Sequence, residues 1–126
     1  MASRSAVFLD LASVDRGDLD LSALHLAASP WTTHPQTPAD LAAARIGDAV
    51  VAVTNKVVVD RAVMAACPGL RLICVAATGT NNVDLGAARE RGVVVCNVTG
   101  YATASVVQHV FALILALTTR LAEHGA

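Results

Sequence analysis

Several features that would point to particular functions are missing from this sequence. Its nine lysine and arginine residues balance ten acidic ones and form no basic stripe, which argues against a nucleic-acid partner. The longest wholly apolar run, residues 110–117, is too short to span a bilayer. The apolar stretch 6–9 is cut off by Asp10, unlike the core of a secretory signal. We therefore expect a cytoplasmic protein with neither nucleic acid nor a membrane as its partner.

The cysteines do not form a metal-binding pattern. Cys67, Cys74 and Cys96 are odd in number and lack the spacing of zinc or iron–sulfur ligands, so we expect no bound metal. Cys74 and Cys96 lie inside apolar runs typical of strands, which predicts buried, reduced thiols. A catalytic cysteine is the less favoured alternative, because no histidine stands near one in the sequence.

The most abundant residue types favour an α/β fold. Hydrophobic residues make up 55% of the chain and are mostly Ala, Val and Leu, which suit helices packed closely on a parallel sheet. Apolar runs predict five strands, at residues 6–9, 26–31, 49–54, 72–75 and 93–96. Helical patterns between these runs predict a doubly wound parallel five-stranded sheet, covered on both sides, with the strand order 2-1-3-4-5. In such folds, ligands bind beyond the carboxyl ends of the strands.

Polar residues mark the expected starts of three helices. Thr37 is predicted to cap a helix that Gly47 ends. Asp60 and Asp84 are each expected to begin a later helix, because an aspartate side chain can accept hydrogen bonds from the first free N–H groups.

The most informative segment is residues 74–84, where an apolar run gives way to a small-residue loop at 76–80. Unpaired backbone N–H groups in such a loop, together with the dipole of the following helix, attract an anion. Lys56 follows the third predicted strand and is expected at the same edge of the sheet. An ordinary surface lysine and an ordinary turn at Thr78-Gly79 are the plain alternatives. The segment favours binding of a small carboxylate or phosphate.

A long final helix is predicted over residues 103–121, and its apolar residues cover more than one face. The preceding domain is expected to cover one side, so a second domain or another subunit must cover the rest. His109 lies among Val107, Val110 and Phe111, and we expect a packed structural histidine rather than an acid–base group.

Four motifs, in order and at matching intervals, resemble the D-isomer-specific 2-hydroxyacid dehydrogenases, in particular the glycerate dehydrogenase or hydroxypyruvate reductase branch. They are Thr54-Asn-Lys56, Ala76-Ala-Thr-Gly-Thr-Asn-Asn-Val-Asp84, Arg91-Gly-Val-Val-Val-Cys-Asn97 and Ser105-Val-Val-Gln-His109. The resemblance implies a flavodoxin-like substrate domain at residues 1–100 and an interdomain, dimerising helix at 101–126. It also implies a homodimer formed through that helix.

The resemblance further implies roles for individual residues. Lys56 resembles a substrate contact, and Ala77, Thr78 and Gly79 resemble the backbone cradle for the carboxylate of a small 2-keto or 2-hydroxy acid. Thr78, together with Thr103 and Val107, resembles a position near the nicotinamide of NAD or NADP.

Part of the family pattern is missing. The dinucleotide fingerprint Gly-x-Gly-x-x-Gly does not occur, and the catalytic Arg, Glu and His of the family belong to later segments. A Rossmann domain is expected to follow the long helix in the whole enzyme, and this chain alone is expected to be inactive. Two alternatives stay open: a non-catalytic flavodoxin-like module that binds an anion or regulates a partner, and an oligomerisation module that exchanges its helix.

Overall fold

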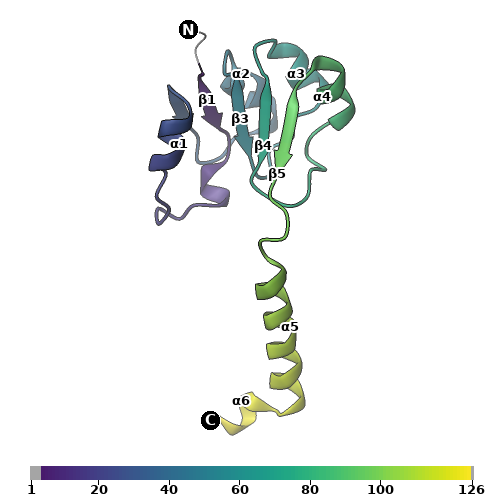
Figure 1. Cartoon of the computed structure of the whole chain (residues 1–126). Coiled ribbons are helices and arrows are strands. Elements are labelled where there is room, and N and C mark those ends of the chain that lie inside the picture. Colours follow the sequence, from purple (N-terminus) through teal and green to yellow (C-terminus); the bar gives the residue numbers. More distant parts are fainter. Residues whose placement is uncertain (1–3, 126) are drawn as a thin grey trace.

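Five short parallel strands form the centre of the fold, and the computed structural model describes residues 4–125. Neighbouring strands follow the order β2-β1-β3-β4-β5, which confirms the predicted topology (Figure 1). The strands are β1 (Ala6–Phe8), β2 (Trp31–Thr33), β3 (Val51–Thr54), β4 (Leu72–Val75) and β5 (Val94–Asn97).

Helices and short 3₁₀ turns lie between the strands, and two further helices follow β5. The 3₁₀ turns are η1 (Leu11–Ser13) and η2 (Ala39–Leu41), and the helices are α1 (Ser22–Ala27), α2 (Ala42–Ile46), α3 (Arg61–Ala66), α4 (Leu85–Arg91), α5 (Thr103–Thr118) and α6 (Leu121–His124). The alternation of strand and helix that the sequence predicts is therefore present along the chain.

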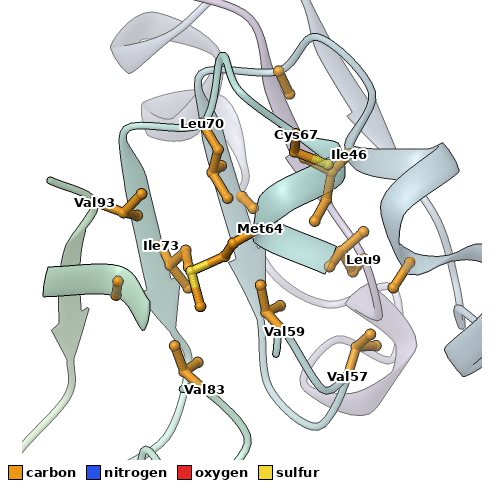
Figure 2. Close-up of a cluster of buried hydrophobic side chains, with 14 of the residues drawn as sticks. Leu9, Ile46, Val57, Val59, Met64, Cys67, Leu70, Ile73, Val83 and Val93 are labelled. Carbon is orange, nitrogen blue, oxygen red and sulfur yellow. The ribbon is translucent and has the colours of Figure 1, made fainter. Parts of the chain in front are cut away.

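The apolar core lies between the sheet and helices α2, α3 and α4. Ile73 of β4 is fully buried, and Met64 of α3 is 1% exposed. Figure 2 shows Met64 reaching toward Ile73, with Val59 and Val83 close by. Because side chains alternate across a strand, Ile73 and Val75 belong to this core while their neighbours face the other side of the sheet.

Two of the predicted helix starts are confirmed. The Asp60 carboxylate accepts a hydrogen bond from the Val63 backbone N–H at 2.9 Å, at the start of α3. The Asp84 carboxylate accepts one from the Ala87 N–H at 2.8 Å, at the start of α4. These bonds satisfy backbone donors that a helix leaves free in its first turn.

Replacing Asp60 with alanine is expected to lower the free energy of unfolding by about 1 kcal/mol, because it removes the side-chain cap of α3. Chemical denaturation measures the change. The control is Asp40→Ala, which removes an exposed carboxylate from the first turn of η2, where no side-chain cap bond is formed. Equal losses in the two variants would contradict the role of Asp60 as a cap.

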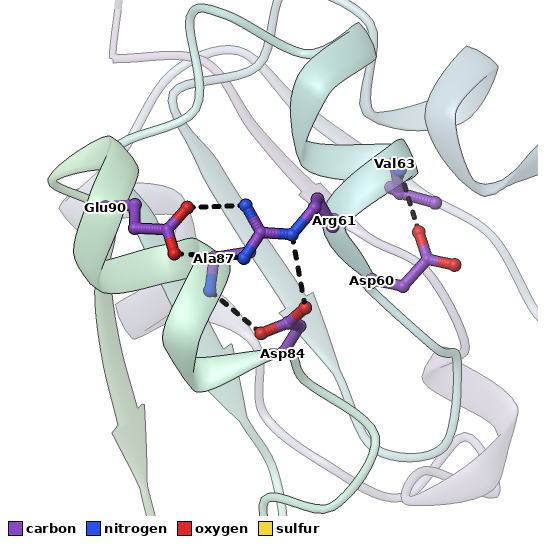
Figure 3. Close-up of polar contacts among 6 residues, drawn as sticks. All are labelled: Asp60, Arg61, Val63, Asp84, Ala87 and Glu90. Carbon is purple, nitrogen blue, oxygen red and sulfur yellow. Dashed lines mark hydrogen bonds and ion pairs between the residues drawn. The ribbon is translucent and has the colours of Figure 1, made fainter.

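An exposed ion pair joins α3 to α4. The Arg61 guanidinium donates two hydrogen bonds to the Glu90 carboxylate, and its Nε lies 3.9 Å from an oxygen of Asp84 (Figure 3). The hydrogen bond from Arg61, and then its charge, lower the pKa of the Glu90 carboxyl below its ordinary value. Because Arg61 and Glu90 are both more than half exposed, this contact is expected to add little to the stability of the fold.

The second strand exists, but its predicted position at residues 26–31 is wrong. Residues Ser22–Ala27 form helix α1, and the strand β2 begins only at Trp31. The Trp31 indole N–H donates to the Leu24 carbonyl at 2.6 Å, which holds the start of the strand against α1. Alanine and leucine favour a helix in the first segment, whereas the aromatic and β-branched residues of β2 favour an edge strand.

Thr37 does not cap a helix, so that prediction is also wrong. Its hydroxyl donates to the Leu9 carbonyl and accepts a hydrogen bond from Arg45 at 2.8 Å. The side chain therefore ties the loop before η2 to the end of β1. The predicted end is confirmed, since α2 stops at Gly47, where φ is 51°.

The second face of the sheet is covered only in part, contrary to the prediction. Phe8 shares an apolar hollow of about 540 Å³ with Leu11 of η1 and Leu24 of α1. Further along, Val94 of β5 is 58% exposed, because nothing within residues 4–125 packs over it. The expected burial of two thiols is therefore wrong: Cys74 is partly exposed, and Cys96 is exposed.

Helix α5 projects away from the sheet (Figure 1), so the prediction that the domain covers one of its sides is wrong. Its large apolar side chains range from 48% exposed at Val110 to 79% at Leu117. His109 is exposed rather than packed, because no other element lies beside it within the described chain. The helix also ends earlier than predicted, at Thr118, since Arg120 adopts a φ of 50° before α6.

Candidate functional site

A polar hollow of about 260 Å³ lies at the carboxyl ends of β3 and β4. This is the edge at which open parallel sheets bind ligands. The loop after β3 contributes one wall and the loop between β4 and α4 contributes the other. The lining residues are Asn55, Lys56, Val58, Ala77, Gly79, Asn81 and Asn82.

The loop between β4 and α4 carries a run of unpaired donors. Ala76 donates its backbone N–H to the Thr54 carbonyl at 2.8 Å, and Val83 donates to the Thr80 carbonyl at 3.0 Å. Among the hydrogen bonds of residues 4–125, none is donated by the six backbone N–H groups of residues 77–82. The loop is partly to fully exposed, apart from buried Val83 at its end. The loop therefore has several backbone N–H groups without a protein acceptor, as the sequence predicts, and binding of an anion to them stays a prediction.

Backbone carbonyl groups, rather than the backbone N–H groups of residues 77–82, anchor this loop. The Asn97 side chain of β5 donates to the Thr78 carbonyl at 2.7 Å, and the Val98 N–H donates to the Ala77 carbonyl at 3.1 Å. On the other side, the Asn82 carbonyl accepts from the Val59 N–H at 2.8 Å. The loop is thus held from two directions while its donors stay free.

Asp10 shapes the opposite wall of the hollow. Its side chain is buried at the end of β1, with the residue 4% exposed. The carboxylate accepts hydrogen bonds from the Asn55 N–H at 2.9 Å and the Lys56 N–H at 2.6 Å. The Asn55 side chain also donates to the Ser13 hydroxyl at 3.0 Å. Asp10 therefore fixes the backbone from which the Lys56 side chain extends.

The predicted first strand, at residues 6–9, ends directly before Asp10, but the sequence alone led us to assign Asp10 no role. The signal was present, since a carboxylate directly after a buried strand needs donors from a neighbouring strand end. Asn97 was missed as well, because a single asparagine after a strand looks the same whether it anchors a loop or faces water.

Lys56 is the only lysine of the chain and is exposed. It lines the hollow together with Ala77 and Gly79, so the structure brings three of the predicted site residues together. Lys56 also borders a second hollow of about 360 Å³, which Asp10 and Thr37 help to line. A cation between two open hollows, opposite a row of N–H donors, suits a ligand with a carboxylate group.

The remaining predicted residues lie elsewhere. Thr78 sits in the same loop but is exposed and does not line the hollow. Thr103 is the first residue of α5 and Val107 follows one turn later, and both are exposed on a helix that stands away from the sheet. The structure therefore does not bring them to the hollow, and their contact with a nicotinamide stays a prediction.

Residues 4–125 contain neither a metal-binding cluster nor a membrane-spanning helix. No group of three or more His, Cys, Asp and Glu side chains is arranged to hold a metal ion there. No helix in that part of the chain is both long and apolar enough to cross a bilayer.

Comparison with known proteins identifies the family. Residues 14–123 match the family described as D-isomer specific 2-hydroxyacid dehydrogenase, catalytic domain. The chain belongs to this family. Among curated relatives of this 2-hydroxyacid dehydrogenase domain, a hydroxypyruvate reductase of Blautia hydrogenotrophica is 37% identical over 121 residues, which are 94% of this chain and 38% of that protein. A glycerate dehydrogenase of Methylorubrum extorquens is 36% identical over 123 residues, covering 98% and 38%.

Solved structures agree with this membership. The pyruvate reductase of Chlamydomonas reinhardtii superimposes with a TM-score of 0.74 at 26% identity, covering 97% of this chain and 37% of that one. An NAD-dependent formate dehydrogenase of Staphylococcus aureus, solved in complex with NAD, shares the fold with a TM-score of 0.72 at 24% identity, covering 94% and 40%. This 2-hydroxyacid dehydrogenase domain thus spans little more than a third of the length of the two curated relatives above.

Proposed function

We propose that this chain binds the substrate carboxylate in an NAD(P)-dependent D-2-hydroxyacid dehydrogenase that acts on a small 2-keto or 2-hydroxy acid. The observation that carries the proposal is the row of six free N–H groups at residues 77–82, opposite Lys56. The curated names of the two relatives support hydroxypyruvate and glycerate as the substrate pair. A cytoplasmic location fits this activity.

We propose that this chain binds the substrate, whereas the rest of the protein binds the cofactor. When bound, the cofactor supplies or accepts the hydride that converts keto acid and hydroxy acid into each other. Because the sequence contains no Gly-x-Gly-x-x-Gly turn, its residues do not fit a dinucleotide site on their own. We therefore assign NAD or NADP to a Rossmann domain of the whole protein and expect this chain alone not to turn over substrate.

The role of the present residues is to hold and orient the acid. Ala77 and Gly79, which line the hollow, are assigned as backbone N–H donors to the carboxylate, and Lys56 neutralises its charge. Thr78 is assigned the same role from its place between them, although it does not itself line the hollow. Asp10 and Asn97 keep the two walls in place. Fixing the carboxylate orients the adjacent keto carbon, which lowers the entropic cost of reaction. Thr103 and Val107 are assigned to the cofactor side of the cleft.

Titration of the isotope-labelled chain with hydroxypyruvate, followed by amide NMR signals, tests this proposal. We expect the signals of residues 77–82, Asn55 and Lys56 to shift in a saturable manner. Acetate serves as a probe that has the carboxylate but lacks the keto group. Shifts confined to other parts of the chain, or no saturable shift, would overturn the proposed substrate site. Equal binding of acetate and hydroxypyruvate would favour the simpler anion-binding module.

Replacing Lys56 with methionine is expected to weaken hydroxypyruvate binding about tenfold, because a hydrogen bond to a charged group contributes about 1.5 kcal/mol or more. We choose the lower end of that range since the side chain is exposed. The matched control is Arg71→Met, which removes an exposed cation just before β4, at the other end of the sheet. If both substitutions weaken binding equally, the effect is one of overall charge rather than of the site.

We also propose the division of the whole protein into a substrate domain, at residues 1–100 of this chain, and an interdomain helix at residues 101–126. The supporting observation is that α5 leaves the sheet and stays exposed. A second copy of the protein is the proposed occupant of its apolar surface, in a homodimer. At roughly 100° per residue, the large apolar side chains span about 200° of the helix, and Ile114 lies near the centre of that arc.

A further inference from the structure

Two cysteines lie side by side on neighbouring strands. Cys74 of β4 and Cys96 of β5 are register partners in a parallel pair, so their side chains leave the sheet on the same face. Neighbouring strands are about 4.8 Å apart, which falls within the Cα separation of about 4.4–6.8 Å that a disulfide can bridge. Their juxtaposition follows from the pairing of the strands and does not depend on a flexible loop.

The surroundings of the two thiols differ. Cys96 is exposed and Cys74 partly exposed, because they occupy the part of the sheet face that no described element covers. Burial raises the pKa of the Cys74 thiol above its ordinary value, and the neighbouring Cys96 raises it further. Cys96 is therefore the accessible member of the pair, and Cys74 is the shielded one. The third cysteine, Cys67, is 2% exposed and donates to the Ala43 carbonyl, so it offers an internal control.

We infer that Cys74 and Cys96 form a dithiol that low-molecular-weight disulfides, such as oxidised glutathione, convert into an intramolecular disulfide. The Cys96 thiolate attacks one sulfur of oxidised glutathione, so that a mixed disulfide forms and one glutathione thiolate leaves. The Cys74 thiolate then attacks the Sγ of Cys96 and releases the second glutathione. The two protein thiols lose two electrons and two protons, and one oxidised glutathione becomes two reduced molecules.

This site is distinct from the carboxylate hollow but connected to it through one residue. Asn97 follows Cys96 and donates its side-chain hydrogen bond to the Thr78 carbonyl. Cys74 lies in β4, two residues before the loop that begins at Ala76. A covalent bond between the two strands would therefore fix the spacing of the strand ends that support the donor loop.

Incubation of the whole chain with oxidised glutathione, followed by intact-mass analysis and non-reducing tryptic mapping, tests the inference. We expect a loss of two hydrogen masses, no retained glutathione, and a linked pair of peptides covering residues 72–89 and 92–120. Cys74→Ser should retain one glutathione on Cys96, and Cys96→Ser should stay largely unmodified. Cys67 should remain a free thiol in all three proteins.

Two results would overturn the inference. One is a wild-type chain that keeps glutathione on Cys96 without forming the linked peptides, which would show that Cys74 cannot reach its partner. The other is formation of the linked peptides only after the chain has been unfolded, because the bond would then not come from the native strand pairing. The peptide map of the wild-type chain distinguishes these outcomes even if a serine variant folds poorly.

Discussion

Replacing Asp10 with alanine is expected to lower the free energy of unfolding by about 2–4 kcal/mol, the largest stability loss that any single polar side chain here should cause. The substitution removes a buried carboxylate that accepts hydrogen bonds from the N–H groups of Asn55 and Lys56. Both donors then lose a charged acceptor, and the loop after β3 loses its attachment to β1. Urea denaturation measures the stability loss.

Two further variants separate the role of Asp10 from a general effect of charge. Asp10→Asn keeps the shape but offers only one acceptor oxygen, so we expect an intermediate loss. Asp48→Ala removes an exposed carboxylate and should change stability by less than about 0.5 kcal/mol. Amide NMR signals of Asn55 and Lys56 should move most in Asp10→Ala. A loss no larger than that of Asp48→Ala would show that the loop holds its shape without Asp10.

Replacing Ile114 with aspartate is expected to turn the proposed homodimer into a monomer. Ile114 is 49% exposed in the isolated chain and lies near the centre of the apolar arc of α5. Burial of each large side chain of that arc is worth about 1.5–3 kcal/mol, and a charge at its centre would have to be desolvated against them. Sedimentation velocity over a range of concentrations gives the state of association.

The control for this substitution lies on the same helix. Ala112→Asp places the same charge near the stripe formed by Ser105, Gln108 and His109, away from the apolar arc. It should leave association unchanged. A wild-type chain that sediments as a monomer at every concentration would remove the basis for a homodimer through α5, whereas equal dissociation in both variants would indicate that the arc does not define the interface.

Much of the fold could be predicted because local sequence and tertiary structure agree. The apolar runs that form β3, β4 and β5 differ from the predicted strands by at most two residues at either end, and Asp60 and Asp84 cap their helices as expected. The prediction of the second strand failed because the segment around Leu26 is apolar enough to form either a strand or a helix. A hydrogen bond from the Trp31 indole helps to hold the start of the strand, and that contact lies outside the local pattern.

The candidate site was predictable in part. The small-residue loop and Lys56 could be located because the carboxyl ends of parallel strands meet at one edge. The position of Asp10 after a buried strand indicated that its carboxylate needs donors, but its actual partner, Lys56, lies more than ten residues away in the sequence. Asn97 gave no such signal, and its partner, Thr78, is also more than ten residues away. The exposure of Cys96 and His109 was also missed, since apolar runs predict burial only where another element covers them.

The presence of a single lysine has a practical consequence. Since Lys56 is the only side-chain amine of the chain, an acylating reagent has one ε-amino target, and that target borders the proposed carboxylate hollow. An organic acid bound in the hollow would protect this amine from acylation. The resulting drop in the acylated Lys56 adduct, measured by mass spectrometry, would therefore report occupancy of the hollow. Candidate acids could then be ranked by chemical footprinting, without spectral assignment and without any turnover.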